Sequence, residues 1–289
     1  MRLTDINHIR QLLDRHGFRF SKSKGQNFLV ADWVPQDIAD SAGLDEKTGV
    51  LEIGPGVGCL TAELSKRAGK VVALELDKTL EGVLHETLGG LSNVEVIYAD
   101  ALKTDLAALA AEKFCALRPV VCANLPYNIT SPILMAIVNT PCFETVTVMI
   151  QREVARRICA RPNTAEYGAF GVFVGWHMEA ELLFDVPPSC FIPQPKVTSS
   201  VIRLTRRAEK PAQVRDEEQM FRLIRAAFNQ RRKTLPNAMC AAFPGLGKER
   251  AQEALIRAGF DTRIRGESLD IVGFAKISNE ITDIMCADL

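Results

Sequence analysis

Residues 50–58 read VLEIGPGVG, in which a short run typical of a buried β-strand leads directly into a glycine-rich turn. Glycine lets the backbone approach a ligand closely, and α/β folds bind nucleotides at the carboxyl ends of their strands. The same residues also suit a tight strand-to-helix turn that holds no ligand. The motif therefore predicts an α/β fold and leaves the ligand open.

The spacing of the glycines bears on which cofactor such a turn would hold. A dinucleotide-binding turn reads Gly-x-Gly-x-x-Gly or Gly-x-Gly-x-x-Ala. Here Gly58 comes one position early, and Cys59 stands where the last small residue belongs. Glu52 is a further departure, because nicotinamide enzymes usually have an apolar strand at this point. We therefore disfavour a nicotinamide oxidoreductase.

Short β-branched runs alternate with helical stretches in the first two-thirds of the chain, which predicts a mostly parallel sheet covered by helices. We expect strands at residues 50–53, 71–76, 94–98, 119–124, 145–150, 180–185 and 200–204, and helices at 58–68, 78–88, 131–138 and 153–160. After a polar stretch at 205–215, the pattern predicts short helices at 216–229, 233–242, 248–258 and 266–277. An α/β domain followed by a small helical domain is the expected organisation.

The composition is that of an ordinary globular protein, with 47% hydrophobic and 24% charged residues. The eight cysteines form no Cys-x-x-Cys pair, and the four histidines show no metal-ligand spacing. No apolar run is long enough to span a membrane. We therefore expect a cytoplasmic protein with reduced thiols, no bound metal and no membrane segment.

The formal charge is zero overall, but its distribution is uneven. Residues 190–265 hold 16 Lys and Arg against 7 Asp and Glu, a net charge of +9, and the remainder of the chain carries −9. Such an asymmetry favours a face that binds a polyanion. Solvated helix faces would give the same count, and charge alone does not separate the two interpretations.

Two carboxylates follow the next strands of the predicted sheet. Glu75 ends the second strand, where it can accept hydrogen bonds from both ribose hydroxyls of an adenosine. Asp100 follows the third strand, where an adenine amino group could donate to it. The glycine turn, Glu75 and Asp100, in this order, resemble the class I S-adenosylmethionine-dependent methyltransferases, whose fold is a Rossmann-like, mostly parallel sheet.

Residues 124–127, Asn-Leu-Pro-Tyr, follow the fourth strand and carry the most specific chemistry in the chain. The amino group of adenine is a poor nucleophile because its lone pair is delocalised into the ring. The Asn124 side-chain oxygen and the Leu125 carbonyl could accept its hydrogens and localise the lone pair toward a sulfonium methyl group. Pro126 stiffens the turn, and Tyr127 offers a ring on which an extruded base can stack. Without a cofactor site nearby, a simple turn with a buried tyrosine would be the better interpretation.

This segment resembles the target-binding motif of the ribosomal RNA adenine methyltransferases, and two further segments narrow the likeness. Residues 24–29, KGQNFL, resemble the segment that this family folds over S-adenosylmethionine. Residues 191–201, FIPQPKVTSSV, resemble its Phe-x-Pro-x-Pro-Lys-Val-x-Ser loop and final strand. The likeness runs from about residue 11 to residue 277, with no departure at a motif position. It is greatest to the members that dimethylate small-subunit RNA.

The resemblance implies roles for particular residues. The cofactor, S-adenosylmethionine, is expected to be bound by Gln26, Asn27, Leu29, Gly54, Gly56, Glu75, Leu76, Asp100, Ala101 and Asn124. The catalytic pocket for the target adenine is expected to consist of Asn124, Leu125, Pro126, Tyr127 and Phe191. Phe191 would close this pocket from the other side, although taken alone it is equally suited to core packing beside the final strand.

The implied substrate is the 3′-terminal hairpin of 16S ribosomal RNA in a nearly assembled small (30S) subunit, where two adjacent adenines receive four methyl groups. Contacts to RNA are expected from Lys196, Arg222, Arg225, Arg231, Arg232 and Lys233, each of which could instead be a solvated basic residue. Residues 1–30 are expected to contribute to the cofactor and RNA sites, 31–207 to form the methyltransferase domain and 208–289 to form a small, basic, all-α RNA-binding domain. The protein is expected to be a monomer with a role in small-subunit biogenesis.

Two other functions remain open at this stage. A methyltransferase of the antibiotic-resistance type, which acts on large-subunit ribosomal RNA, would share the fold and the motifs. The complete segment at 191–201 and the long N-terminal segment disfavour it. A non-catalytic assembly factor would keep the fold and bind RNA, but the intact Asn-Leu-Pro-Tyr and the intact cofactor acids disfavour lost catalysis.

Overall fold

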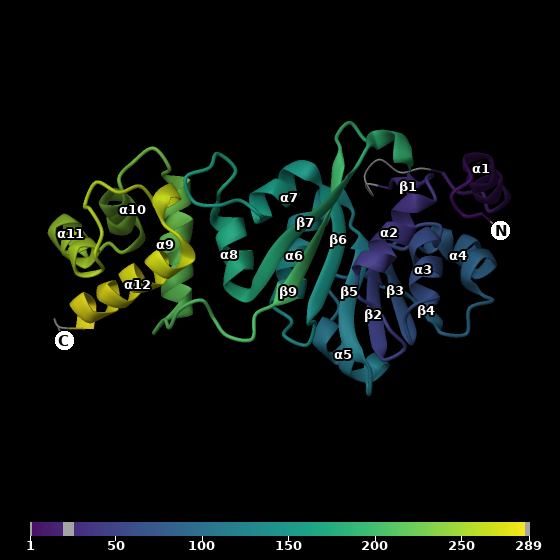
Figure 1. Ribbon diagram of the computed structural model, residues 1–289, viewed down its shortest axis with the longest axis horizontal. Helices are drawn as coiled ribbons and strands as arrows, with labels where there is room; N and C mark the ends of the chain where they lie inside the picture. The colour runs from purple at the N-terminus through teal and green to yellow at the C-terminus, as the bar shows by residue number, and fades with distance from the viewer. Residues whose placement is uncertain (1, 20–25, 287–289) are drawn as a thin grey trace. The chain divides into compact units, whose positions relative to one another are not determined.

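A computed structural model describes residues 2–19 and 26–286 of the chain (Figure 1). The chain divides into two compact units, which we call the sheet unit and the helical unit. The sheet unit comprises Met1–Ala155 and Ala180–Arg206, and the helical unit comprises Arg156–Glu179 and Arg207–Leu289. One division between the units falls after Arg206, and residues 156–179 group with the C-terminal helices.

A seven-stranded sheet forms the centre of the sheet unit, in the order β4-β3-β2-β5-β6-β9-β7. Its strands are β2 (Thr48–Ile53), β3 (Lys70–Glu75), β4 (Val94–Tyr98), β5 (Arg118–Asn124), β6 (Thr145–Gln151), β7 (Met178–Val186) and β9 (Ser199–Arg206). The pairs from β4 to β6 are parallel, and β9 pairs antiparallel with β6. Each expected strand is present, with bounds that differ by at most two residues.

Helices cover both sides of these strands, as Figure 1 shows. Those of the sheet unit are α1 (Ile6–Arg15), α2 (Trp33–Ser41), α3 (Cys59–Ser65), α4 (Glu81–Leu88), α5 (Leu106–Phe114) and α6 (Thr130–Val138), and α7 (Arg152–Ile158) begins there. Every residue of β2 is buried, so both faces of this central parallel strand are covered. Val50 belongs to the cluster that α2 and α3 bury. Gly49 points the other way, because a Cβ there would lie 2.3 Å from Cδ1 of Phe114 in α5.

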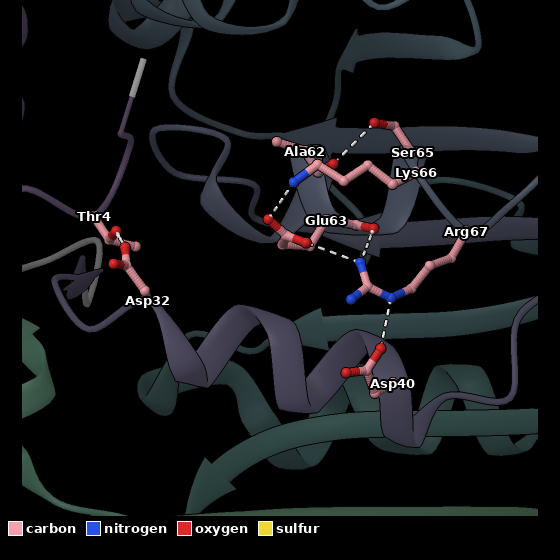
Figure 2. A network of polar contacts seen from close by, with 8 residues as sticks. All are labelled: Thr4, Asp32, Asp40, Ala62, Glu63, Ser65, Lys66 and Arg67. Carbon is pink, nitrogen blue, oxygen red and sulfur yellow. Dashed lines mark hydrogen bonds and ion pairs between the residues drawn. The ribbon is translucent and has the colours of Figure 1, made fainter.

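The packing of α2 beside α3 is accompanied by the polar network in Figure 2. The guanidinium of Arg67, just after α3, donates to Asp40 of α2 through Nε at 2.7 Å and to Glu63 of α3 through Nη1 at 2.8 Å. Lys66 also donates to Glu63, at 2.6 Å. The buried apolar side chains between the two helices supply most of the stabilisation, since partly exposed ion pairs contribute about 1 kcal/mol or less.

A short antiparallel pair brings together two segments that are far apart in the sequence. Strand β1 (Phe28–Leu29) pairs with β8 (Phe191–Ile192), with Leu29 opposite Phe191. This pair brings together parts of the two segments, 26–29 and 191–201, that resemble the family in addition to the Asn-Leu-Pro-Tyr motif. Lys24 and Gly25, the first two residues of the KGQNFL segment, lie outside the described residues.

The helical unit is built around a separate apolar core. Its helices are α8 (Ala169–His177), α9 (Glu217–Asn229), α10 (Leu235–Ala242), α11 (Gly247–Arg257) and α12 (Ile271–Cys286). Tyr167, Val172 and Trp176 are buried in the same cluster as the C-terminal helices, which is why residues 156–179 group with them. The hydroxyl of Tyr167 donates to the Leu269 carbonyl at 2.9 Å. Helix α12 runs nine residues beyond the expected end, because the buried Ile281 and Ile284 continue its apolar face.

Candidate active site

A cavity of about 190 Å³ lies at the carboxyl ends of β2, β3, β4 and β5 in the sheet unit. Open α/β sheets bind ligands at this edge. All of the residues expected to contact the cofactor line it: Gln26, Asn27, Leu29, Gly54, Gly56, Glu75, Leu76, Asp100, Ala101 and Asn124. Leu125, Pro126 and Tyr127 of the expected catalytic pocket line it as well, and Phe191 does not. One cavity thus combines segments from five regions of the chain.

The glycine turn forms the floor of this cavity. Gly54, Gly56 and Gly58 have φ angles of 74°, 62° and 89°, in the left-handed region that disfavours side chains. A Cβ on Gly56 would also approach Cδ1 of Phe28 to 3.0 Å. Gly56 is therefore required twice, by its own backbone conformation and by the close packing of the N-terminal segment over the turn.

Glu75 lies at the end of β3, 6% exposed. Its Oε1 accepts a hydrogen bond of 2.7 Å from the backbone N–H of Asp77. Burial raises the pKa of Glu75, while N–H groups of Asp77, Gly56 and Leu76 oppose that rise. The carboxylate is held in place by the backbone and borders the cavity, as an acceptor for ligand hydroxyls should.

Asp77 is a buried acid of the cavity that the sequence motifs do not single out. It is 3% exposed and lines the cavity two residues after Glu75. Its Oδ2 accepts from Nε2 of Gln26 at 2.8 Å, and its Oδ1 accepts from the backbone N–H of Thr79 at 3.1 Å. The Gln26–Asp77 hydrogen bond therefore ties the N-terminal segment to the loop that follows β3.

Glu52 is a second buried acid to which the sequence motifs give no role. It lines the cavity, is 1% exposed, and its Oε2 has no hydrogen-bond partner among the described residues. Burial raises the pKa of Glu52 to about 8. The carboxyl therefore holds a proton at neutral pH and lies at the cavity as a neutral polar group. The protonated state of Glu52 cannot be inferred from the spacing of residues in the sequence, because it results from desolvation in the folded protein.

Asn124 is the last residue of β5, and Asp100 lies in the turn after β4. The Asn124 side-chain nitrogen donates to the Asn27 carbonyl at 3.5 Å, which leaves its oxygen as the remaining acceptor. Asp100 accepts from the backbone N–H of Leu102 at 3.0 Å and is half-buried. Both side chains are thus oriented by contacts of the chain itself before any ligand binds.

Tyr127 begins a short 3-10 turn, Tyr127–Ile129, immediately after Asn-Leu-Pro. Tyr127 lines the cavity, and its hydroxyl lies 2.5 Å from Oγ of Ser199, the first residue of β9. Burial raises the pKa of Tyr127, so the hydroxyl stays protonated over the physiological range. Ser199 is 0% exposed and is not among the site residues expected from sequence.

Two residues of the expected sites make contacts within their own unit. Phe191 does not line the cavity: it is 2% exposed and belongs to the apolar cluster that includes Leu29 and Cys190. Arg231 is not a freely exposed basic residue: its guanidinium forms an ion pair of 3.1 Å with Glu267 and donates to the Ala165 carbonyl at 2.9 Å. Both side chains stabilise their own unit, Phe191 by apolar packing and Arg231 by an ion pair and a hydrogen bond. Neither contact can be inferred from a sequence motif or from the charge distribution.

The other expected RNA-binding residues are exposed. Lys196 lies in the loop between β8 and β9, Arg222 and Arg225 lie on α9, and Arg232 and Lys233 follow it. The guanidinium of Arg222 lies 4.3 Å from the ring centroid of Phe243, which restrains it on the surface of the helical unit. Arg225, Arg232 and Lys233 form no ion pair with the described residues. These three are therefore available to a polyanion.

Comparison with known proteins decides the family. A family model described as ribosomal RNA adenine dimethylase matches residues 17–283. This chain belongs to that family. Members named ribosomal RNA small subunit methyltransferase A are 45% identical to it in Geobacillus thermodenitrificans (94% of each chain covered) and in Listeria monocytogenes serotype 4a (95% of each).

Solved structures agree with the family. A dimethyladenosine transferase from Plasmodium falciparum has a TM-score of 0.72 and 26% identity, covering 86% of this chain and 95% of that one. The 23S ribosomal RNA methyltransferase ErmE has a TM-score of 0.66 and 28% identity, covering 88% and 99%. The expected fold is confirmed: a class I methyltransferase sheet with a C-terminal helical region. The chain is an S-adenosylmethionine-dependent adenine methyltransferase of ribosomal RNA.

Two kinds of feature are absent from residues 2–19 and 26–286. No helix there is both long and apolar enough to cross a membrane. No group of three or more His, Cys, Asp or Glu within the same residues could hold a metal ion.

Proposed function

We propose that this enzyme transfers methyl groups to N6 of two adjacent adenines in the 3′-terminal hairpin of 16S ribosomal RNA, within small ribosomal subunits in the cytoplasm. The observation that carries the proposal is the shared cavity, which the Asn124–Tyr127 segment lines together with Glu75 and Asp100. The choice of small-subunit RNA is supported by identity. The relatives named for the small subunit are 45% identical over nearly the whole chain, against 28% for the 23S enzyme.

The cavity suits S-adenosylmethionine. When bound, this cofactor supplies a methyl group on a sulfonium, which is transferred as the sulfur becomes a neutral thioether. We assign the ribose hydroxyls to the Glu75 carboxylate, which is buried and already held by the Asp77 N–H. We assign the adenine amino group of the cofactor to Asp100. The left-handed turn at Gly54 and Gly56 allows the remainder of the ligand to lie against backbone.

The acceptor end of the cavity suits an adenine amino group. We assign its two hydrogens to the Asn124 side-chain oxygen and the Leu125 carbonyl, which localises the nitrogen lone pair toward the methyl group. Once methylated, the nitrogen is acidic enough to lose its proton to water or a carbonyl, so no strong base is required. Pro126 holds the turn, and the Tyr127 ring supplies a stacking surface for the extruded base.

The exposed basic residues of the helical unit suit a phosphate backbone. We assign phosphate contacts to Arg222, Arg225, Arg232 and Lys233, and a further contact to Lys196 of the sheet unit. Such contacts position RNA without specifying its sequence, so target choice rests with the cavity and the shape of the subunit. We propose that the enzyme acts as a monomer, since one chain supplies all the lining residues of the cavity.

The test is methyl transfer from labelled S-adenosylmethionine to undermethylated small subunits and, in parallel, to large subunits, followed by nucleoside analysis. N6,N6-dimethyladenosine from small subunits alone is the expected result. Label in large-subunit RNA would contradict the proposal and indicate the resistance-type activity, which the similarity to ErmE would then support. Absence of label from both would indicate an assembly factor instead.

A further inference from the structure

Ser199 contacts the ring that the proposed mechanism stacks on the target base. The Ser199 Oγ and the Tyr127 hydroxyl are 2.5 Å apart, although the two residues are 72 positions apart in the chain. Ser199 is fully buried, so water does not compete for its hydroxyl. Both residues belong to the sheet unit.

The sheet register explains how Ser199 reaches this position. Strand β9 runs antiparallel to β6, which places Ser199 opposite Gln151, at the carboxyl end of β6. Strand β5 is parallel to β6 and pairs Asn124 with Met149, so the Asn-Leu-Pro-Tyr segment leaves the sheet at the same edge. The first residue of β9 therefore lies beside the turn that follows β5.

A tyrosine ring anchored at one end can still swing about its side-chain torsions. The backbone end of Tyr127 is held by its 3-10 turn, where Thr130 Oγ1 donates to the Pro126 carbonyl at 2.9 Å. The hydrogen bond to Ser199 holds the opposite end of the ring. Held at both ends, the ring presents one orientation to the cavity, which lowers the entropy lost when a base stacks on it.

We propose that Ser199 is a positioning residue for methyl transfer, whose hydroxyl holds the Tyr127 ring in the orientation that stacks on the target adenine. This inference rests on the proposed function. Ser199 does not line the cavity, so it acts only through the tyrosine hydroxyl. Its loss should therefore lower kcat and leave the affinity for S-adenosylmethionine unchanged.

The neighbouring serine offers a matched control. Ser200 is equally buried, and its hydroxyl donates to Oδ1 of Asp185 at 2.5 Å. It points to the opposite face of β9, away from Tyr127, because side chains alternate along a strand. Ser200→Ala thus removes a buried serine hydrogen bond from the same strand without touching the ring.

The experiment compares Ser199→Ala, Tyr127→Phe, the double variant and Ser200→Ala, measuring kcat and KM on undermethylated small subunits, cofactor Kd and thermal stability. We expect Ser199→Ala and Tyr127→Phe each to lower kcat about three- to tenfold, with Kd within twofold. The double variant should be no slower than either single variant, because both remove the same bond. Ser200→Ala should retain wild-type kcat even where its melting temperature falls as far.

Two results would overturn the inference while leaving the proposed function intact. One is a kcat for Ser199→Ala equal to that of Ser200→Ala. The other is a double variant whose loss is the product of the two single losses, which would mean that the serine acts independently of the ring. Absence of transfer by the wild-type enzyme would instead overturn the proposed function itself. If Ser199→Ala does not fold, Tyr127→Phe alone tests the bond, and wild-type kcat in that variant contradicts the inference.

Discussion

The polar side chains proposed to act in the cavity of the sheet unit are buried or half-buried, whereas those proposed to act in the helical unit are exposed. Glu75 and Asp77 are 6% and 3% exposed, and each accepts a hydrogen bond from a backbone N–H. Arg225, Arg232 and Lys233 lie on the surface of the helical unit. The first arrangement places individual atoms to about the precision of a hydrogen bond, as group transfer requires. The second provides positive charge without fixed geometry, which is sufficient for phosphates.

The contrast implies different responses to mutation. When a substitution removes one partner of a buried hydrogen bond, the other partner is left unsatisfied. The loss of free energy is large because water cannot replace the bond. An exposed basic residue contributes through screened attraction, so the effect of removing it is small and depends on salt. Single substitutions should therefore separate chemistry from binding in the sheet unit, whereas the helical unit requires several at once.

The largest effect is expected from Asn124→Ala. Transfer should fall at least about a hundredfold, because one acceptor for the adenine amino group is removed where charge develops in the transition state. The affinity for S-adenosylmethionine should change by no more than a few-fold. Single-turnover transfer and calorimetry measure the two quantities. Asn139→Ala, an exposed asparagine outside the cavity, is the control. Wild-type turnover by Asn124→Ala would remove the assigned role.

A smaller effect, on cofactor affinity, is expected from Glu75→Gln. Loss of a charged acceptor should weaken S-adenosylmethionine binding about ten- to a hundredfold. Burial raises the pKa of Glu75, and ligand hydroxyls require its ionised form. Wild-type affinity should therefore fall as the pH is lowered through that raised pKa, and Glu75→Gln should lack this fall. Calorimetric titrations between about pH 5 and pH 8 measure both. Glu112→Gln, with an exposed side chain, should behave as wild type, and a pH-independent wild-type affinity would contradict the assignment.

In the helical unit, the triple variant Arg225→Glu, Arg232→Glu, Lys233→Glu should weaken RNA binding about tenfold at moderate salt. The slope of log K against log salt should flatten by about 0.7 to 0.9 for each phosphate that is no longer neutralised. Filter binding across a salt series measures both. Lys248→Glu, Arg257→Glu, Arg263→Glu makes the same change of net charge elsewhere in this unit. Equal effects from the two triples would assign the attraction to net charge and not to this patch.

The smallest effect, on stability, is expected from Arg231→Ala. The free energy of unfolding should drop by about 1 kcal/mol, because this variant lacks the half-exposed pair with Glu267 and the bond to the Ala165 carbonyl. The salt slope of RNA binding should not change. Urea unfolding measures the stability, with the exposed Arg232→Ala as the comparison. A larger loss of RNA affinity in Arg231→Ala than in Arg232→Ala would return Arg231 to the RNA-binding set.

Local sequence patterns are sufficient for the strands of the seven-stranded sheet and for most of the helices, but they do not predict β1, β8, α1, α2 or α5. Each expected strand forms because a β-branched run bounded by turn residues has few other stable conformations. Helix α8, residues AFGVFVGWH, is not predicted from sequence, because it is apolar on all sides and shows no helical period. Its burial in the core of the helical unit is what stabilises it.

Motifs also anticipate which turns and strand ends line the cavity, because glycine turns and strand-end acids act through local backbone geometry. The hydrogen-bond partners of those residues cannot be predicted from motifs. Gln26 reaches Asp77, and Tyr127 reaches Ser199, across long stretches of chain, and the register of β9 on β6 places Ser199 at the required edge. Desolvation, which protonates Glu52, likewise exists only once the surrounding segments have packed. Side-chain identity and spacing are properties of the chain, whereas burial and long-range hydrogen bonds are properties of the fold.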